Sequence, residues 1–211
     1  SVLRECDSIS IGELAKSEAE EISFIYNQPL WLVNLWMNEM GKDKTVDLCA
    51  WFNEQPRLTA RINTVKVSIE DCIKELQNLG WTIEQDKDIP EVVYIDSHQG
   101  HLEKAKPVIE GHITFMDKAS MLVAHVVDPQ PEERILDCCA APGGKSMHMA
   151  SLMHNTGAIM SCDIYDHKLD LMNQNAERLG VSIVSTKLQD GRSLPDNWKE
   201  QFDRVLVDAP C

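Results

Sequence analysis

The chain has 211 residues, which is enough for one large domain or two small ones, and its formal net charge is −14. Apolar residues make up 43% of it, so the chain can bury a core and is not a disordered polymer. No apolar run reaches the roughly 18 residues of a membrane span, and no signal peptide opens the chain. The acidic balance counts against nucleic-acid binding, although a local basic face can bind RNA on an acidic protein. Because the sequence starts at Ser1 rather than Met, we expect it to begin inside a longer protein.

The cysteines and histidines indicate a reducing compartment and no metal site. Seven cysteines occur and none forms a C-x-x-C pair, so we predict a cytoplasmic protein with neither a disulfide framework nor zinc. Seven histidines occur without an H-E-x-x-H motif, and we expect most of them at the surface, without a role.

Residues 1–53 are predicted to form a helical segment. Pro29 can open a helix that Gly41 closes, and 45–52 fits another short helix. Three tryptophans in this segment, Trp31, Trp36 and Trp51, are expected to pack in its core.

Residues 54–118 are predicted to form a small α+β module that resembles an RNA-binding domain. Ser68 can cap a helix that Gly80 ends. Strands are expected over 58–63, 91–95 and 112–116. Arg57, Arg61 and Lys66 carry three positive charges with no acid between them. They fit either a solvated strand face or RNA phosphate contacts, and the sequence leaves both open.

Residues 119–211 are predicted to form a third domain, entered through a helix over 117–127 and a Pro-rich break at 128–131. From Arg134 onward, short apolar strands alternate with helices, which favours a parallel, doubly wound sheet. Strands are expected over 134–137, 158–163, 181–186 and 204–207, and helices over 145–153 and 166–179.

The strongest signal follows the first of these strands, where Cys139-Ala140-Ala141-Pro142-Gly143-Gly144-Lys145 leads into a helix. Glycines there let the backbone approach a ligand, and the helix N-terminus offers free N–H groups to an anion. The next strand ends at Asp163, 19 residues after Gly144 (163 − 144 = 19), where an acid commonly holds a ribose hydroxyl.

Three ligands compete for this loop. A P-loop for ATP or GTP requires glycine where this chain has Cys139, and the G-x-G-x-x-G motif for NAD is absent. S-adenosylmethionine has a ribose for Asp163 and no phosphate, so the chemistry favours it. A tight turn without any ligand also remains open.

Two further acids follow strands of the predicted sheet. Asp190 comes just after the third strand and Asp208 just after the fourth, at the edge where parallel α/β sheets bind ligands. Asp190 could accept a hydrogen bond from an adenine amino group, or it could simply form an Asx turn before Gly191.

The C-A-A-P-G-G-K loop at 139–145 and the D-A-P-C run at 208–211 together resemble the Sun-type RNA cytosine-5 methyltransferases, in particular the bacterial enzymes acting on small-subunit ribosomal RNA. The resemblance extends more weakly through 61–64 and 28–32. It implies an α/β fold with a Rossmann-like S-adenosylmethionine-dependent methyltransferase sheet, here incomplete, preceded by a helical segment and a small α+β module.

The resemblance also assigns roles. It implies that S-adenosylmethionine is the cofactor and is bound by the loop residues Cys139, Ala140, Ala141, Pro142, Gly143, Gly144 and Lys145. Asp163 would hold the ribose, Asp190 the adenine, and Asp208 would lie near both cofactor and target base. Family members attack the base with a cysteine in a later T-C pair, and Cys211 would then assist release, although the DNA enzymes use the Pro-Cys thiol as nucleophile.

The chain ends before that T-C pair and before three strands of the expected sheet, so we expect the fragment to be inactive and to self-associate through its open sheet edge. The predicted substrate is RNA, most directly small-subunit ribosomal RNA. Transfer RNA, or a non-catalytic RNA-binding module with a vestigial methyltransferase fold, are the alternatives.

Overall fold

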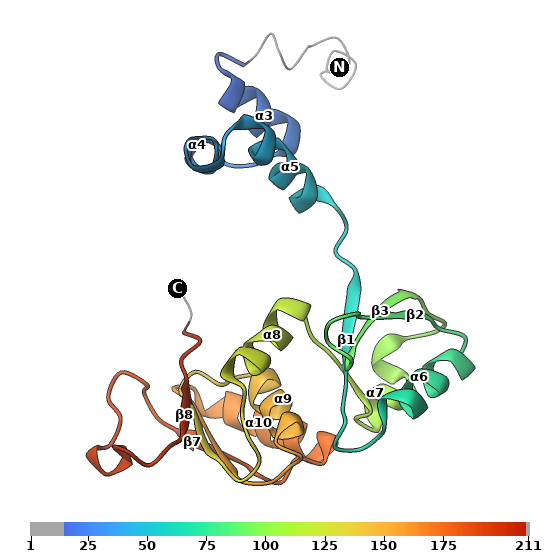
Figure 1. The fold of residues 1–211 in the computed structure, drawn as a ribbon, viewed down its shortest axis with the longest axis vertical. Helices are drawn as coiled ribbons and strands as arrows, with labels where there is room; N and C mark the ends of the chain where they lie inside the picture. Colours follow the sequence, from blue (N-terminus) through green and yellow to red (C-terminus); the bar gives the residue numbers. More distant parts are fainter. Residues whose placement is uncertain (1–14, 210–211) are drawn as a thin grey trace. The chain divides into compact units, whose positions relative to one another are not determined.

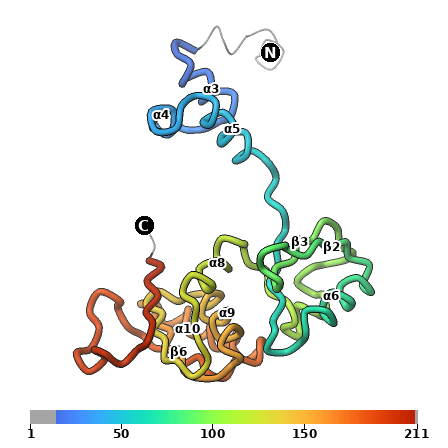
Figure 2. Tube along the Cα trace, in the orientation of Figure 1, coloured from blue at the N-terminus to red at the C-terminus, as the bar shows by residue number. Residues whose placement is uncertain are grey.

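The computed structural model describes residues 15–209 and divides into two compact units, Ser1–Pro56 and Arg57–Cys211. The first unit contains three helices in its described part: α3 (Glu18–Tyr26), α4 (Leu30–Met40) and α5 (Lys42–Asn53). Figure 2 traces this unit in blue. Ser17 caps α3, Pro29 precedes α4 as expected, and Gly41 separates α4 from α5 at φ 83°. Among the described residues, no helix is long and apolar enough to cross a bilayer.

The prediction that the tryptophans of this unit pack in its core is wrong for two of them. Trp31 is 68% exposed and Trp51 is 62% exposed, whereas Trp36 packs against the core and stacks on Phe52. The reason lies in α4, which carries more apolar side chains than one buried face holds, so that within the described residues only Val33 of this helix is completely buried.

The second unit begins with a four-stranded antiparallel sheet of order β2-β3-β1-β4. Its strands are β1 (Leu58–Ile62), β2 (Thr82–Gln85), β3 (Val92–Ser97) and β4 (Ile113–Phe115). The helices are α6 (Ile69–Asn78), capped by Ser68, the short η2 (Leu102–Lys104) and α7 (Lys106–Ile109). The sequence did not indicate β2, because three of its four side chains are exposed and polar and no apolar alternation marks it.

The parallel sheet follows, with strand order β7-β6-β5-β8. Its strands are β5 (Arg134–Asp137), β6 (Ala158–Asp163), β7 (Val184–Leu188) and β8 (Arg204–Leu206). One face of this sheet is covered by three helices: α8 (Lys118–Val127), α9 (Gly144–Leu152) and α10 (Asp166–Leu179). They share an apolar core with the sheet, and Figure 1 shows them between β8 and the antiparallel module. On the opposite face, Trp198 of η3 (Asp196–Trp198) and Phe202 cover Leu136 and Cys162. The predicted fold class is confirmed.

The module and the parallel sheet are joined by buried polar contacts. The amide of Asn63 donates to the backbone carbonyls of Gly111 and Leu179, each at 2.8 Å. Arg178 near the end of α10 donates at 2.8 Å to the Val108 carbonyl and at 2.8 Å to the Thr114 hydroxyl. Because these bonds satisfy otherwise orphaned backbone groups, they fix α10 against β4.

Candidate active site

A cleft of about 910 Å³ opens at the carboxyl ends of the parallel strands. Ligands of open α/β sheets bind at this edge, because the loops that leave the strands converge there. The cleft is lined by the loops after β5, β6, β7 and β8 and by residues of the segment from Phe115 to Ser120. All of the cofactor-site residues predicted from the sequence, apart from Gly143, line this cleft: Cys139, Ala140, Ala141, Pro142, Gly144, Lys145, Asp163, Asp190 and Asp208.

The loop over 139–145 turns sharply at Gly143, which has φ 97° and precedes the first residue of α9. A Cβ atom at Gly143 would lie 3.2 Å from the Cγ atom of Met172, so both the backbone angle and the space favour glycine. The loop therefore lies close under the cleft, and the N-terminus of α9 points its free N–H groups toward any anion bound there.

Asp163 ends β6 and is nearly buried, with 8% of the residue exposed. Its Oδ1 atom accepts the backbone N–H of Tyr165 at 3.0 Å, and the Lys168 ammonium lies 3.8 Å away. The carboxylate is thus held in place at the strand end, in the position where the sequence places a ribose-binding acid.

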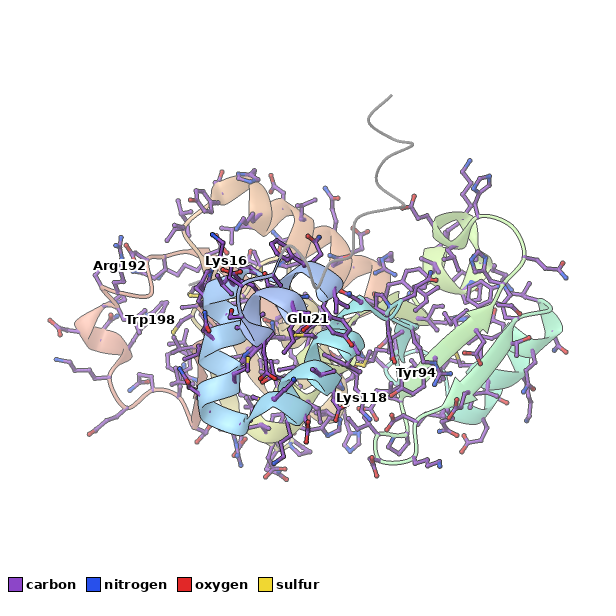
Figure 3. The ribbon with its side chains drawn as sticks, turned by 90° about the horizontal axis from the view of Figure 1, so that it is seen from above. Lys16, Glu21, Tyr94, Lys118, Arg192 and Trp198 are labelled. Atoms are coloured by element: carbon purple, nitrogen blue, oxygen red, sulfur yellow. The ribbon has the colours of Figure 1, made fainter. Side chains whose placement is uncertain are left out.

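Asp190 lies in the cleft wall, but Arg192 occupies its carboxylate. The guanidinium donates to both oxygens, at 3.0 Å from Nε to Oδ1 and 2.7 Å from an Nη to Oδ2, and the Arg192 backbone N–H also donates to Oδ1 at 2.9 Å. These bonds lower the pKa of Asp190 to about 2. The backbone bond is the Asx turn that the sequence left open, so local geometry supports that alternative. Figure 3 labels Arg192 on the segment that follows β7.

Asp208 follows β8 and forms an ion pair with Lys145 of α9. Both side chains line the cleft and remain partly exposed. The chain segments are 63 residues apart (208 − 145 = 63), and only the parallel pairing of β5 with β8 brings them together. Cys211, the other predicted catalytic residue, lies outside the described residues.

The structure adds a buried acid that the sequence analysis did not single out. Asp137 ends β5 directly before the loop and accepts a hydrogen bond from the Ser146 hydroxyl at 2.7 Å; Ser161 in turn donates to Ser146 at 2.8 Å. Burial raises the pKa of Asp137 to about 6, against the opposing effect of the Ser146 hydrogen bond. Its position at a strand end, like those of Asp163 and Asp208, was the available signal.

The three basic residues of the module, Arg57, Arg61 and Lys66, all form hydrogen bonds with other residues of this chain. Arg61 is fully buried and donates to the Ser151 hydroxyl at 3.0 Å. Of the two alternatives that the sequence left open, a solvated strand face and a phosphate contact, neither fits this buried guanidinium. Burial lowers its pKa to about 10. Arg57 pairs with Glu84 and Asp96, and Lys66 donates to the carbonyls of Glu110 and Arg178.

One histidine departs from the expectation of surface positions. His148 on α9 is completely buried, and its Nε2 lies 2.9 Å from Glu91 Oε1, which His125 Nε2 also approaches at 2.6 Å. Three potential metal ligands therefore converge here, as they do at Glu75, Glu110 and His112. Burial, with the Arg61 charge as a further cause, lowers the pKa of His148 to about 4. The buried positive charge of Arg61 disfavours a metal cation at this place. The hydrogen bonds of Glu91 to His125 and His148 are enough to explain why the three side chains lie together.

Tyr94 and Lys118, labelled in Figure 3, converge on one acid of the module. Both donate to Asp86 Oδ2 at 2.6 Å, and the backbone N–H groups of 88 and 89 donate to Oδ1. These bonds hold the pKa of Asp86 well below its usual range. Asp86, Tyr94 and Lys118 do not line the cleft, although Lys118 is the first residue of α8. Their mutual hydrogen bonds indicate a structural role, in which Asp86 ties α8 to the module.

Comparison with known proteins agrees with the fold and the motifs. The family model described as 16S rRNA methyltransferase RsmB/F matches residues 124–211, and the ferredoxin-like domain model of the RsmF/B-like methyltransferases matches residues 28–100. A Bacillus subtilis protein named probable ribosomal RNA small subunit methyltransferase B is 35% identical over 186 residues, which cover 88% of this chain and 41% of that protein. The chain thus spans about two fifths of the length of this relative.

Two further similarities are to a human protein and to a solved structure. The human tRNA (cytosine(72)-C(5))-methyltransferase NSUN6 is 40% identical over 116 residues, which cover 49% of this chain and 25% of that protein. The crystal structure of a methyltransferase homolog from Pyrococcus horikoshii superimposes with a TM-score of 0.82 at 24% identity, covering 93% of this chain and 64% of that chain.

The parallel sheet has a glycine-containing loop after its first strand and an aspartate at or just after the end of each of the next three strands, and a ferredoxin-like module precedes it. This arrangement is that of a Rossmann-like methyltransferase fold. The chain belongs to the RsmB/F methyltransferase family, and the Sun-type resemblance carried by its two motifs is confirmed.

Proposed function

We propose that the protein of which this chain is part transfers a methyl group from S-adenosylmethionine to carbon 5 of a cytosine in RNA. The observation that carries the proposal is the single cleft in which the 139–145 loop, Asp163 and the Lys145–Asp208 ion pair meet. Membership of the family supports methyl transfer to RNA as the type of reaction, and the cleft contains residues that suit the binding of S-adenosylmethionine.

The residues present fit the cofactor. The N-terminus of α9 suits the carboxylate of S-adenosylmethionine, and Asp163 suits the ribose hydroxyls. Asp190 would contact the adenine amino group once Arg192 releases its carboxylate. The bound cofactor supplies a methyl group on a positively charged sulfur.

The substrate chemistry explains why a thiol and an acid are required. Carbon 5 of cytosine is a weak nucleophile until a thiolate adds to carbon 6 and converts the ring into an enamine. After methylation, a base removes the carbon 5 proton and the thiolate leaves, which restores the aromatic ring. Asp208 would accept a hydrogen bond from N3 of the attacked ring once that nitrogen carries a proton, and its ion pair with Lys145 would hold the carboxylate in the cleft. The motif assigns Cys211 to release.

Small-subunit ribosomal RNA is the proposed substrate, because a family model for 16S rRNA methyltransferases and the Bacillus subtilis relative both point to it. Transfer RNA is the alternative substrate, because the human relative is named as a transfer RNA methyltransferase. The cytoplasm is the proposed location, consistent with the five described cysteines, which are all free thiols.

The test maps 5-methylcytosine in ribosomal and transfer RNA from cells with and without the full gene. We expect the deletion strain to lose one 5-methylcytosine in ribosomal RNA. The wild-type gene should restore it, and a Cys211→Ser, Asp208→Asn double variant should not. A lost site in transfer RNA instead would select the alternative substrate. Unchanged RNA, with normal binding of RNA to the protein, would favour a non-catalytic RNA-binding module.

A further inference from the structure

The cleft has a second wall that the cofactor assignments do not use. Phe115, Met116, Asp117 and Ser120 line it, and they come from the end of β4 and the start of α8, before the parallel sheet begins. At about 910 Å³ the cleft lies near the upper end of the roughly 300–1,000 Å³ typical of small-molecule sites. It therefore has room for a second group beside a cofactor.

Phe115 is the aromatic residue of this wall, and its ring is not part of the described hydrophobic cores. The residue is 36% exposed, and within residues 15–209 its ring makes no stacking or cation–π contact. The other aromatic residue in the cleft is Tyr165, two residues after Asp163; it is 51% exposed, and the Lys168 ammonium lies 4.7 Å from the centroid of its ring. Phe115 thus offers a partly exposed aromatic ring in the lining of the cleft.

The position of Phe115 relative to the cofactor loop is fixed from two directions. On one side, Arg178 of α10 donates to the Thr114 hydroxyl at 2.8 Å and lies 3.5 Å from the Ile113 carbonyl. On the other side, Met116 packs against Gly144, with its sulfur 3.6 Å from where a Cβ atom of that glycine would lie. The residues on both sides of Phe115 are therefore held in place, which positions Phe115 before any ligand binds.

We propose that Phe115 is the stacking surface for the target nucleobase of the RNA, so that the module wall is the substrate half of the cleft. The inference rests on the proposed function. A base must leave its stack or come from a single-stranded loop to reach a buried reaction centre, and an aromatic face compensates for the lost stacking. Asp117 and Ser120 beside the ring supply polar groups for the edges of the base.

The experiment uses the full-length protein, an in-vitro transcribed 16S rRNA and bulk transfer RNA as separate substrates, and radiolabelled S-adenosylmethionine. Phe115→Ala is expected to lower kcat/KM for the RNA about 5- to 150-fold, the range that one stacked base contributes. The dissociation constant for S-adenosylmethionine, measured by calorimetry, should stay within about twofold, because the ring contacts base and not cofactor. Phe115→Tyr should restore most of the activity.

Leu122→Ala is the matched control, because Leu122 is an exposed apolar residue of α8 that does not line the cleft. It should leave both quantities near wild type. A Phe115→Ala protein with wild-type kcat/KM, or one that loses affinity for S-adenosylmethionine by the same factor as kcat/KM, overturns the inference while the proposed function stands. A wild-type protein that binds no S-adenosylmethionine and methylates neither RNA overturns both.

Discussion

Ser146 donates a hydrogen bond to Asp137 across 2.7 Å, and both side chains are buried beneath the loop that lines the cleft. The second carboxylate oxygen of Asp137, Oδ1, has no hydrogen-bond partner among the described residues. A buried carboxylate with an unsatisfied oxygen disfavours its charged form, and this accounts for the direction of its pKa shift.

Asp137→Asn should therefore change how stability depends on pH. Burial raises the pKa of Asp137 from 3.8 to about 6, so between these values the folded state keeps a proton that the unfolded state releases. The free energy of unfolding consequently falls as pH rises through this window, by about 3 kcal/mol in all. The asparagine variant lacks this decline and should be more stable at pH 7. Urea titrations from pH 3.5 to 7.5 measure it, and parallel curves for the two proteins would contradict the assignment.

Asp163→Ala should weaken S-adenosylmethionine binding to the full-length protein by about 1–3 kcal/mol, the cost of a lost hydrogen bond to a charged group. Calorimetry measures the effect. Asp170→Ala is the control, since Asp170 lies on α10 and does not line the cleft. Equal affinity for the Asp163 variant and wild type would refute the ribose assignment.

Arg192→Ala should tighten S-adenosylmethionine binding. The arginine occupies both oxygens of Asp190, so the cofactor must displace an exposed ion pair before its adenine can reach the carboxylate. Exposed pairs are weak, so the gain should reach only about fivefold. Lys199→Ala removes a comparable exposed pair outside the cleft and should change nothing. Weaker binding in the Arg192 variant would mean that Arg192 itself contacts the cofactor.

Gly111→Ala should destabilise the junction between the module and the parallel sheet. A Cβ atom at Gly111 would lie 2.2 Å from the Arg178 carbonyl oxygen, and φ there is 74°. Gly100→Ala is the matched control, because φ is 75° and no atom lies within 4 Å. The control should lose about 1–2 kcal/mol from the backbone angle alone, and Gly111→Ala a further 1–3 kcal/mol from the clash. Equal losses in thermal melts would show that the junction yields easily.

The 211-residue polypeptide, expressed by itself, should self-associate. Among the described residues β8 is an edge strand, with Val205 54% exposed and Val207 65% exposed beside it. Unpaired edge strands recruit other chains. Light scattering should detect association that Val205→Lys suppresses and that the full gene product lacks. A stable monomer of the 211-residue chain would disprove the edge contact.

The sequence by itself determined the features that depend on neighbouring residues. The strand–loop–helix context of 139–145, the spacing from Gly144 to Asp163 and the helix ends at Ser68, Gly41 and Gly180 all follow from local backbone preferences, and the structure has each of them. The family followed from the resemblance of two short motifs, C-A-A-P-G-G-K and D-A-P-C, to those of the Sun-type enzymes.

Only the tertiary structure decided which side chains meet and which are buried. The ion pair of Lys145 with Asp208 depends on β5 pairing with β8, and the burial of Arg61 depends on α9 covering β1 with Ser151. Trp31 is 68% exposed although its sequence context is apolar, because no other element of the part of the chain that the structure describes packs over it. Burial and long-range pairing depend on the packing of whole elements, and no local pattern encodes them.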